Sequence, residues 1–257
     1  MFADERQKVI HEHIKKRGAV TTATLMDEFN VSIETVRRDL LSMERKGLLK
    51  RVHGGAVAIS EMKHFYELKE RSKEFVKEKR ELSVNAADYV NENDILFVDT
   101  GSTAIHFAEV LKERFGNLTI VTHSLDVFNI LSGHKDFEVI LCGGYFDKKE
   151  NSFYGSMALE ALSKIFVQKA FIFPSAVSLE FGICDYNKDL ALIQKQIFKS
   201  MDEIYVLADS GKFEKKALLK LEDMKNEFHY ITDNNLTDEL KRLYKENGID
   251  IIGGNDI

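Results

Sequence analysis

One ten-residue stretch, Val31–Leu40, constrains this 257-residue chain more than any other part. Ser32 can accept hydrogen bonds from the free amides of a first helical turn, and Glu34 puts negative charge at the positive end of the helix dipole. Apolar residues at i, i+3, i+7 and i+10 predict one buried stripe, formed by Ile33, Val36, Leu40 and Met43. The stretch is therefore expected to be a helix that packs through one face.

The opposite face of this helix is polar and rich in arginine. Its outward residues are Glu34, Thr35, Arg38, Ser42 and Arg45, with Arg37 at the edge of the stripe. Hydroxyl and guanidinium groups on a packed helix suit insertion into the major groove of DNA. An ordinary solvated surface helix is the alternative, because charged runs usually face water.

The segments before this stretch predict a helix-turn-helix. Ala3–Lys16 has apolar residues on one side and is followed by Gly18, a common residue just past a helix end. A short second helix is expected from Thr21 or Thr22 to Phe29. Two short helices, a tight turn and an outward polar helix are typical of this motif, which we place at about residues 20–39.

Two short apolar runs follow the helix and predict a β-hairpin. Leu48–Val52 and Ala56–Ile59 flank Gly54 and Gly55, a favourable pair for a tight turn. A hairpin directly after a helix-turn-helix is a wing. Its cationic or titratable side chains suit backbone phosphates, and they are Lys50, Arg51 and His53.

These residues together resemble the DNA-binding head of the DeoR/GlpR family of bacterial transcription regulators. The resemblance rests on Val31–Ser32, Thr35–Leu40, Gly47, Leu49 and Arg51–Ala56, and it spans roughly residues 3–58. It implies a winged helix-turn-helix domain over residues 1–60 that binds a double-stranded operator. The DNA-binding residues are then expected to be Ser32, Thr35, Arg37, Arg38, Lys50, Arg51 and His53. Arg37 could instead pack or pair internally.

Charge and composition limit the remaining possibilities. The net charge is −6, yet residues 1–60 carry 11 Lys and Arg against 8 Asp and Glu, so the basic excess lies where DNA contact is expected. No apolar run reaches 18 residues and the first 17 residues lack a signal-peptide core, so we expect a cytoplasmic protein without a membrane segment. Cys142 and Cys184 lack zinc-ligand spacing, so no metal site is expected, and free thiols are favoured over a disulfide. No cofactor is expected either.

The rest of the chain predicts a helical connector and an α/β domain. Residues 61–82 are dense in Lys and Glu and are expected to form a helix held by Phe65, Leu68 and Phe75. Residues 83–257 alternate short β-rich apolar runs with helical stretches, which is typical of a mostly parallel sheet with crossover helices. The expected strands are 95–98, 118–121, 137–141, 170–173, 204–207, 228–231 and 249–252. The expected helices are 103–114, 124–132, 156–166, 187–201 and 236–246.

Small and polar residues follow four of these strands. In open α/β sheets, ligands bind beyond the carboxyl ends of the strands, and glycine and hydroxyl groups at a helix N-terminus suit a phosphate. Turn and cap geometry alone explains any single loop. Taken together, the loops favour a phosphorylated small molecule, with these candidate residues: Asp99, Gly101, Ser102, Thr103, His123, Gly143, Gly144 and Lys212.

The same loops extend the resemblance to nearly the whole chain. Asp99–Thr103, Val121–Ser124, Gly143–Gly144, Gly155 and Leu207–Phe213 are similar to the sensor domain of the DeoR/GlpR family. That domain is similar in fold to ribose-5-phosphate isomerase and glucosamine-6-phosphate deaminase, an isomerase/CoA-transferase-like architecture. The resemblance implies that a phosphorylated sugar or related metabolite binds there and weakens operator binding. The chain departs from the family pattern at two places. One is His123, where the family usually has Asn, and the other is Phe173–Val177. The identity of the effector is therefore not determined by the resemblance.

Three functions remain from the sequence. The main hypothesis is a repressor of a carbohydrate operon, acting as a homodimer or homotetramer because one head covers only a short DNA site. The second is a phosphosugar isomerase or deaminase with a DNA-binding head. The sequence contains carboxylates that could serve as a base but no evident acid–base pair, so no catalytic residue is assigned. The third is a DNA-binding scaffold whose sensor pocket has decayed around Pro174.

Overall fold

A computed structural model describes residues 2–46, 48–52, 54–57, 68–201 and 203–253. The chain divides into two compact units. The first consists of Met1–Tyr66 with Lys215–Leu218, and the second of Glu67–Glu214 with Leu219–Ile257.

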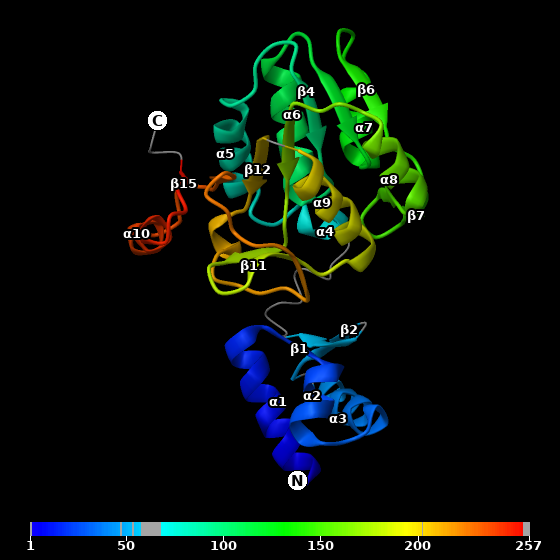
Figure 1. Ribbon diagram of the computed structural model, residues 1–257, viewed down its shortest axis with the longest axis vertical. Helices are drawn as coiled ribbons and strands as arrows, with labels where there is room; N and C mark the ends of the chain where they lie inside the picture. The colour runs from blue at the N-terminus through cyan, green and yellow to red at the C-terminus, as the bar shows by residue number, and fades with distance from the viewer. Residues whose placement is uncertain (1, 47, 53, 58–67, 202, 254–257) are drawn as a thin grey trace. The chain divides into compact units, whose positions relative to one another are not determined.

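The described residues of the first unit form three helices and a small antiparallel sheet (Figure 1). Its helices are α1 (Ala3–Arg17), α2 (Thr22–Phe29) and α3 (Ile33–Arg45). Its strands are β1 (Ala19–Thr21), β2 (Lys50–Val52) and β3 (Gly55–Val57), in the order β1-β3-β2. The predicted hairpin is confirmed over the described residues, and β1 adds a third strand that the sequence did not reveal.

The ends of these helices form at the residues that the sequence indicated. Gly18 ends α1 at φ 74°, and Asn30 ends α2 in the left-handed conformation at φ 50°. Val36, Leu40 and Met43 are buried as expected in the stripe of α3. The expectation for Ile33 was wrong, because this first residue of the helix lies outside the core cluster and is 37% exposed.

One close approach explains the glycines of the wing. A Cβ built on Gly55 would lie 2.0 Å from the carbonyl oxygen of Val20, so only glycine lets β3 approach β1. Gly54 adopts φ +88°, and its carbonyl accepts the backbone N–H of Thr22 at 2.7 Å. The turn therefore fixes the wing against the start of α2.

The second unit is built on a seven-stranded parallel sheet, in the order β15-β14-β12-β9-β4-β5-β6. These strands are β4 (Ile95–Val98), β5 (Thr119–Thr122), β6 (Glu138–Leu141), β9 (Lys169–Ile172), β12 (Glu203–Leu207), β14 (His229–Ile231) and β15 (Ile251–Ile252). The helices are α4 (Leu68–Arg71), α5 (Val76–Ala87), α6 (Ser102–Arg114), α7 (Leu125–Leu131), α8 (Ser156–Ser163), α9 (Lys188–Ser200) and α10 (Asp238–Glu246). All seven predicted strands and the five predicted helices of residues 83–257 are confirmed, with ends shifted by a few residues.

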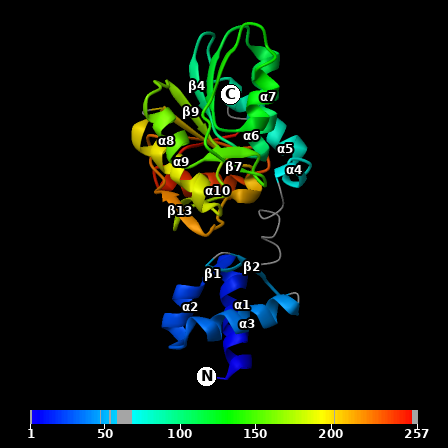
Figure 2. The ribbon, with the colours of Figure 1, turned by 90° about the vertical axis from the view of Figure 1, so that its right-hand side faces the viewer.

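Each face of this sheet has its own hydrophobic core. Residues of α5, α6 and α7 pack on one face, and residues of α8, α9 and α10 on the other (Figure 2). Neighbouring residues of β4 alternate between them, since Leu96 packs in the first core and Phe97 in the second. Because helices cover both faces, the strands read as continuous apolar runs.

Several short elements were not predicted. β7 (Tyr145–Asp147) pairs with β8 (Ser152–Tyr154), and β10 (Ala176–Ser178), β11 (Gly182–Asp185) and β13 (Leu219–Glu222) form a small antiparallel sheet. The predicted connector helix is interrupted between α4 and α5, and its residues 61–67, including Phe65, lie outside the described residues. Leu68 is buried as expected. Phe75 is not, because it adopts φ 51° at this interruption and is 48% exposed.

The described part of the chain has neither a membrane-spanning helix nor a metal-ligand cluster. None of its helices is long and apolar enough to cross a membrane. Within the same residues, no group of three or more His, Cys, Asp or Glu side chains is arranged to hold a metal ion. Cys142 and Cys184 are buried free thiols.

Candidate functional site

Two hydroxyl side chains close the N-terminus of α3. Ser32 Oγ accepts a hydrogen bond from the backbone N–H of Thr35 at 3.3 Å, and the two hydroxyl oxygens lie 3.1 Å apart. Each hydroxyl oxygen has two lone pairs and keeps capacity for another partner. The two residues expected at the DNA therefore also hold the first turn of the helix that presents them.

The two neighbouring arginines of α3 differ in their surroundings. Arg37 donates a hydrogen bond from Nη1 to Glu34 Oε1 at 2.8 Å, and both side chains are exposed. Arg38 is also exposed, and it makes no hydrogen bond or ion pair with any residue that the structure describes. The guanidinium of Arg38 is therefore available for another partner, whereas that of Arg37 is already bonded to Glu34.

The wing is fastened to α3 by an acidic residue. Glu44 accepts the backbone N–H of Arg51 at 2.9 Å, and its oxygens lie 3.5 Å from Lys50 Nζ and 3.7 Å from Arg51 Nε. Lys50 and Arg51 stay exposed, so they can reach phosphates while sharing one carboxylate. The predicted contact of His53 lies outside the described residues.

A buried ion pair, which the sequence analysis did not single out, orients α3. Arg6 Nε donates to Asp39 Oδ2 at 2.7 Å, and both side chains are at most 10% exposed. The hydrogen bond to Asp39 raises the pKa of the Arg6 guanidinium. This pair joins α1 to α3 and fixes which face of α3 is exposed. The sequence signal that could have indicated this pair is Asp39, an acidic residue directly after Arg37 and Arg38.

In the second unit, the loop after β4 leads into the N-terminus of α6. Gly101 adopts φ 142°, a conformation that side-chain-bearing residues avoid, and starts this 13-residue helix. Ser102 and Thr103 follow in its first turn, where free amides favour an anion. Thr103 is 1% exposed, and its Oγ1 has no hydrogen-bond partner among the described residues. A buried hydroxyl without a partner costs free energy, so this atom is a candidate ligand-binding group.

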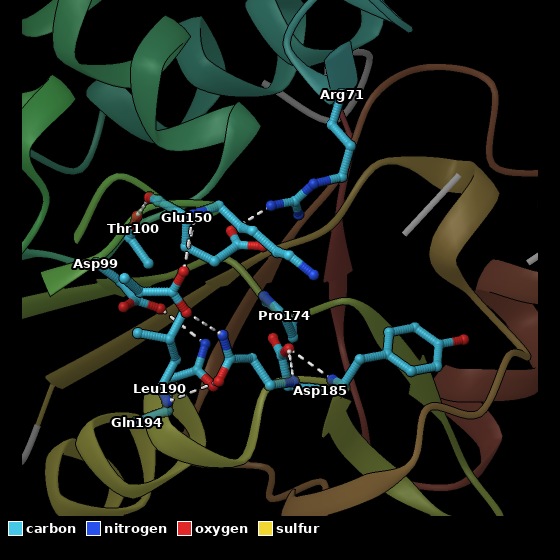
Figure 3. Close-up of polar contacts among 12 residues, drawn as sticks. Arg71, Asp99, Thr100, Glu150, Pro174, Asp185, Leu190 and Gln194 are labelled. Carbon is cyan, nitrogen blue, oxygen red and sulfur yellow. Dashed lines mark hydrogen bonds and ion pairs between the residues drawn. The ribbon is translucent and has the colours of Figure 1, made fainter. Parts of the chain in front are cut away.

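Asp99 and His123, both predicted in the effector site, contact each other. Asp99 Oδ1 lies 2.7 Å from His123 Nε2. Asp99 Oδ2 accepts Gln194 Nε2 at 2.8 Å, and both of these residues are labelled in Figure 3. His123 Nδ1 lies 2.8 Å from the carbonyl oxygen of Phe153. Asp99 and His123 are fully buried. Asp99 therefore supports the loop after β4, because both of its oxygens are already engaged.

The remaining predicted residues have separate surroundings. A Cβ on Gly144 would lie 2.4 Å from the carbonyl oxygen of Tyr154, whereas Gly143 has open space around it. Gly144 therefore permits close approach to the backbone of Tyr154. Lys212 Nζ donates to the carbonyl of Pro174 at 2.8 Å and lies 3.9 Å from Asp209 Oδ2. Burial lowers the pKa of Lys212.

Sequence reasoning did not assign Arg71, Lys79, Glu150 or Asp185 to this site. Arg71 is ion-paired with Glu150, as Figure 3 shows, and both side chains are 15% exposed. Burial raises the pKa of the Glu150 carboxyl and of Asp185. Lys79 is 3% exposed; burial, reinforced by the positive charge of Lys212, lowers its pKa to about 8. Shifted acids and bases gathered together are typical of functional sites. Arg71 and Lys79 had no distinguishing signal, because their stretch is uniformly charged.

Family models match both units. Residues 6–62 match the DeoR-like helix-turn-helix domain, and residues 74–234 match the DeoR C terminal sensor domain.

Relatives match along nearly their whole length. The HTH-type transcriptional regulator YulB of Bacillus subtilis (strain 168) is 32% identical, over 92% of this chain and 91% of its own. A lactose phosphotransferase system repressor of Staphylococcus epidermidis (strain ATCC 35984) is 31% identical, over 93% and 95%. An L-fucose operon activator of Haemophilus influenzae (strain Rd) is 27% identical, over 95% and 97%.

Among solved structures, ribose 5-phosphate isomerase A from Neisseria gonorrhoeae is similar at 18% identity and a TM-score of 0.40. The match covers 53% of each chain, about half the length of that enzyme. The two family models and the full-length relatives establish the identity: this chain belongs to the DeoR family of helix-turn-helix transcriptional regulators.

Proposed function

We propose that this regulator represses a carbohydrate operon and is released from its operator by a phosphorylated sugar or related metabolite. It works in the cytoplasm as a homodimer or homotetramer, since one reading helix covers only a short site. The similar lactose phosphotransferase system repressor supports the repressor assignment. One similar protein is an L-fucose operon activator, so repression and activation have to be distinguished by measuring transcription from the operon.

The observation that carries the proposal is the unpartnered hydroxyl of Thr103. It lies in the first turn of α6, next to amides that favour an anion, and it is buried. A phosphate oxygen there would supply the missing hydrogen-bond partner. We assign Ser102, Thr103 and Lys212 to direct effector contact, and Asp99 and His123 to support of the loop.

A thermal-shift screen of the purified protein against sugar phosphates tests this function. A ligand that binds only the folded state raises the melting temperature, and the hit should then release an operator duplex in a gel-shift assay. No shift across a broad panel would favour the decayed-pocket hypothesis.

Catalysis is the second candidate, and the surroundings of Asp99 disfavour it. A general base needs an oxygen within reach of the substrate proton, yet both Asp99 oxygens are engaged by protein groups, one with His123 Nε2 and the other with Gln194 Nε2. Turnover of ribose 5-phosphate or glucosamine 6-phosphate by the pure protein would instead favour the enzyme over the regulator.

A further inference from the structure

Helix α4 is the first described element of the second unit, and it follows residues 58–67 in the sequence. Its contacts include the following three. The Arg71 side chain pairs with Glu150, the backbone N–H of Leu68 donates to the carbonyl of Lys149 at 3.0 Å, and the Leu68 side chain is buried. Two of these contacts are made with the turn between β7 and β8.

That turn is joined to the candidate effector loop. Thr100 Oγ1 donates to the carbonyl of Glu150 at 3.3 Å, and Thr100 directly follows Asp99. The backbone N–H of Leu125, at the start of α7, donates to the carbonyl of Asn151 at 2.9 Å. A contiguous set of contacts therefore runs from the loop after β4 through Glu150 to α4 (Figure 3).

Two further cations, Lys79 and Lys212, lie buried in the same part of the second unit. Lys79 Nζ donates to the carbonyls of Arg71 at 2.5 Å and Glu74 at 2.6 Å. Lys212 donates to a carbonyl and lies 3.9 Å from Asp209. Buried positive charges so placed attract an anion, and a second anion competes with Glu150 for Arg71.

We propose that Arg71 is the positioning residue that couples effector binding to operator release. An anionic effector at the N-terminus of α6 draws Arg71 away from Glu150 and loosens α4, the element next to the segment that leads to the DNA-binding unit. This rests on the proposed function, because it needs an anionic effector that weakens operator binding. Loss of the Glu150 carboxylate should imitate the effector.

The test compares operator affinities of full-length variants by fluorescence anisotropy, without any effector, on a duplex selected from random sequences with the wild-type protein. Glu150→Gln and Arg71→Met should each weaken binding about tenfold, within the usual range of allosteric coupling. The double variant should also lose about tenfold, since both changes break one contact. Glu113→Gln is the matched control. It breaks an exposed ion pair with Arg80 in the same unit and should change affinity less than twofold.

A purely structural role would lower the melting temperature of the Arg71 and Glu150 variants and leave operator affinity equal to that of Glu113→Gln, which would overturn the proposal. If Arg71→Met does not fold, Glu150→Gln and the milder Arg71→Lys give the same comparison. Equal losses in the Glu113→Gln control would also overturn it. A wild-type protein that selects no duplex would instead contradict the proposed function, and the coupling with it.

Discussion

The ring of His123 lies between two hydrogen-bond acceptors, with Nε2 2.7 Å from Asp99 Oδ1 and Nδ1 2.8 Å from the carbonyl oxygen of Phe153. A carbonyl oxygen can only accept, so Nδ1 donates to Phe153, while Nε2 engages the carboxyl group of Asp99. With Gln194 on the second oxygen of Asp99, this buried set fixes the loop after β4.

This geometry predicts that His123 holds the loop after β4 in place. His123→Phe should lower the free energy of unfolding by more than about 2 kcal/mol, because the buried carboxyl group of Asp99 and the carbonyl of Phe153 both lose a partner. Urea unfolding measures this loss, and unchanged stability would contradict the supporting role of His123.

Thr103→Val should separate ligand binding from folding. Valine has nearly the same shape, and the lost hydroxyl has no partner among the described residues, so stability should change by less than about 0.5 kcal/mol. Affinity for a sugar-phosphate hit should fall about tenfold, the equivalent of one hydrogen bond to a charged group. Isothermal titration calorimetry measures this loss.

Thr122→Val is the matched control. Thr122 Oγ1 donates to the carbonyl of Val98 at 2.7 Å and accepts the backbone N–H of Ser124 at 3.0 Å. This variant should lower stability by about 1–3 kcal/mol. If Thr103→Val bound the hit as wild type does, Thr103 would not be a ligand.

Arg38→Ala and Arg37→Ala should have different effects. Arg38 is exposed without a partner in the described structure, so its removal should abolish specific operator binding and leave the melting temperature unchanged. Arg37 is paired with Glu34, and its removal should have the smaller effect on binding and cost at most about 0.5 kcal/mol of stability. Gel-shift assays with both variants decide between them. Wild-type affinity of Arg38→Ala would rule out its assignment.

Lys79 should make stability rise with pH above 8. Its folded-state pKa is lowered to about 8, so between that pH and its ordinary pKa near 10.5 the unfolded chain binds more protons. Folding therefore becomes more favourable across this interval, by about 2 kcal/mol between pH 8 and pH 10. Urea unfolding of wild type and Lys79→Met at both pH values measures it. The two proteins should differ in slope, and identical pH dependence would show that Lys79 titrates normally.

The sheet could be predicted from sequence because burial on both faces leaves continuous apolar runs such as Ile95–Val98. The hairpin of β7 and β8 could not, since Tyr145 and Phe146 are exposed and the strands are short. The polar pairs around the candidate site could not be predicted from the sequence either. Arg71 and Glu150 are 79 positions apart, and Asp99 and Gln194 are 95 apart, so no local pattern joins them. The sequence alone therefore does not distinguish a loop residue that binds a ligand from one, such as Asp99, that bonds to other protein groups.

The most direct test of the central claim is an anisotropy titration of the protein–operator complex with the sugar phosphate found in the thermal-shift screen. Wild type should release the duplex as the ligand is added, and Thr103→Val should need about tenfold more ligand for the same release. Retention of the duplex by wild type at ligand concentrations that saturate the thermal shift would contradict the claim that effector binding releases DNA.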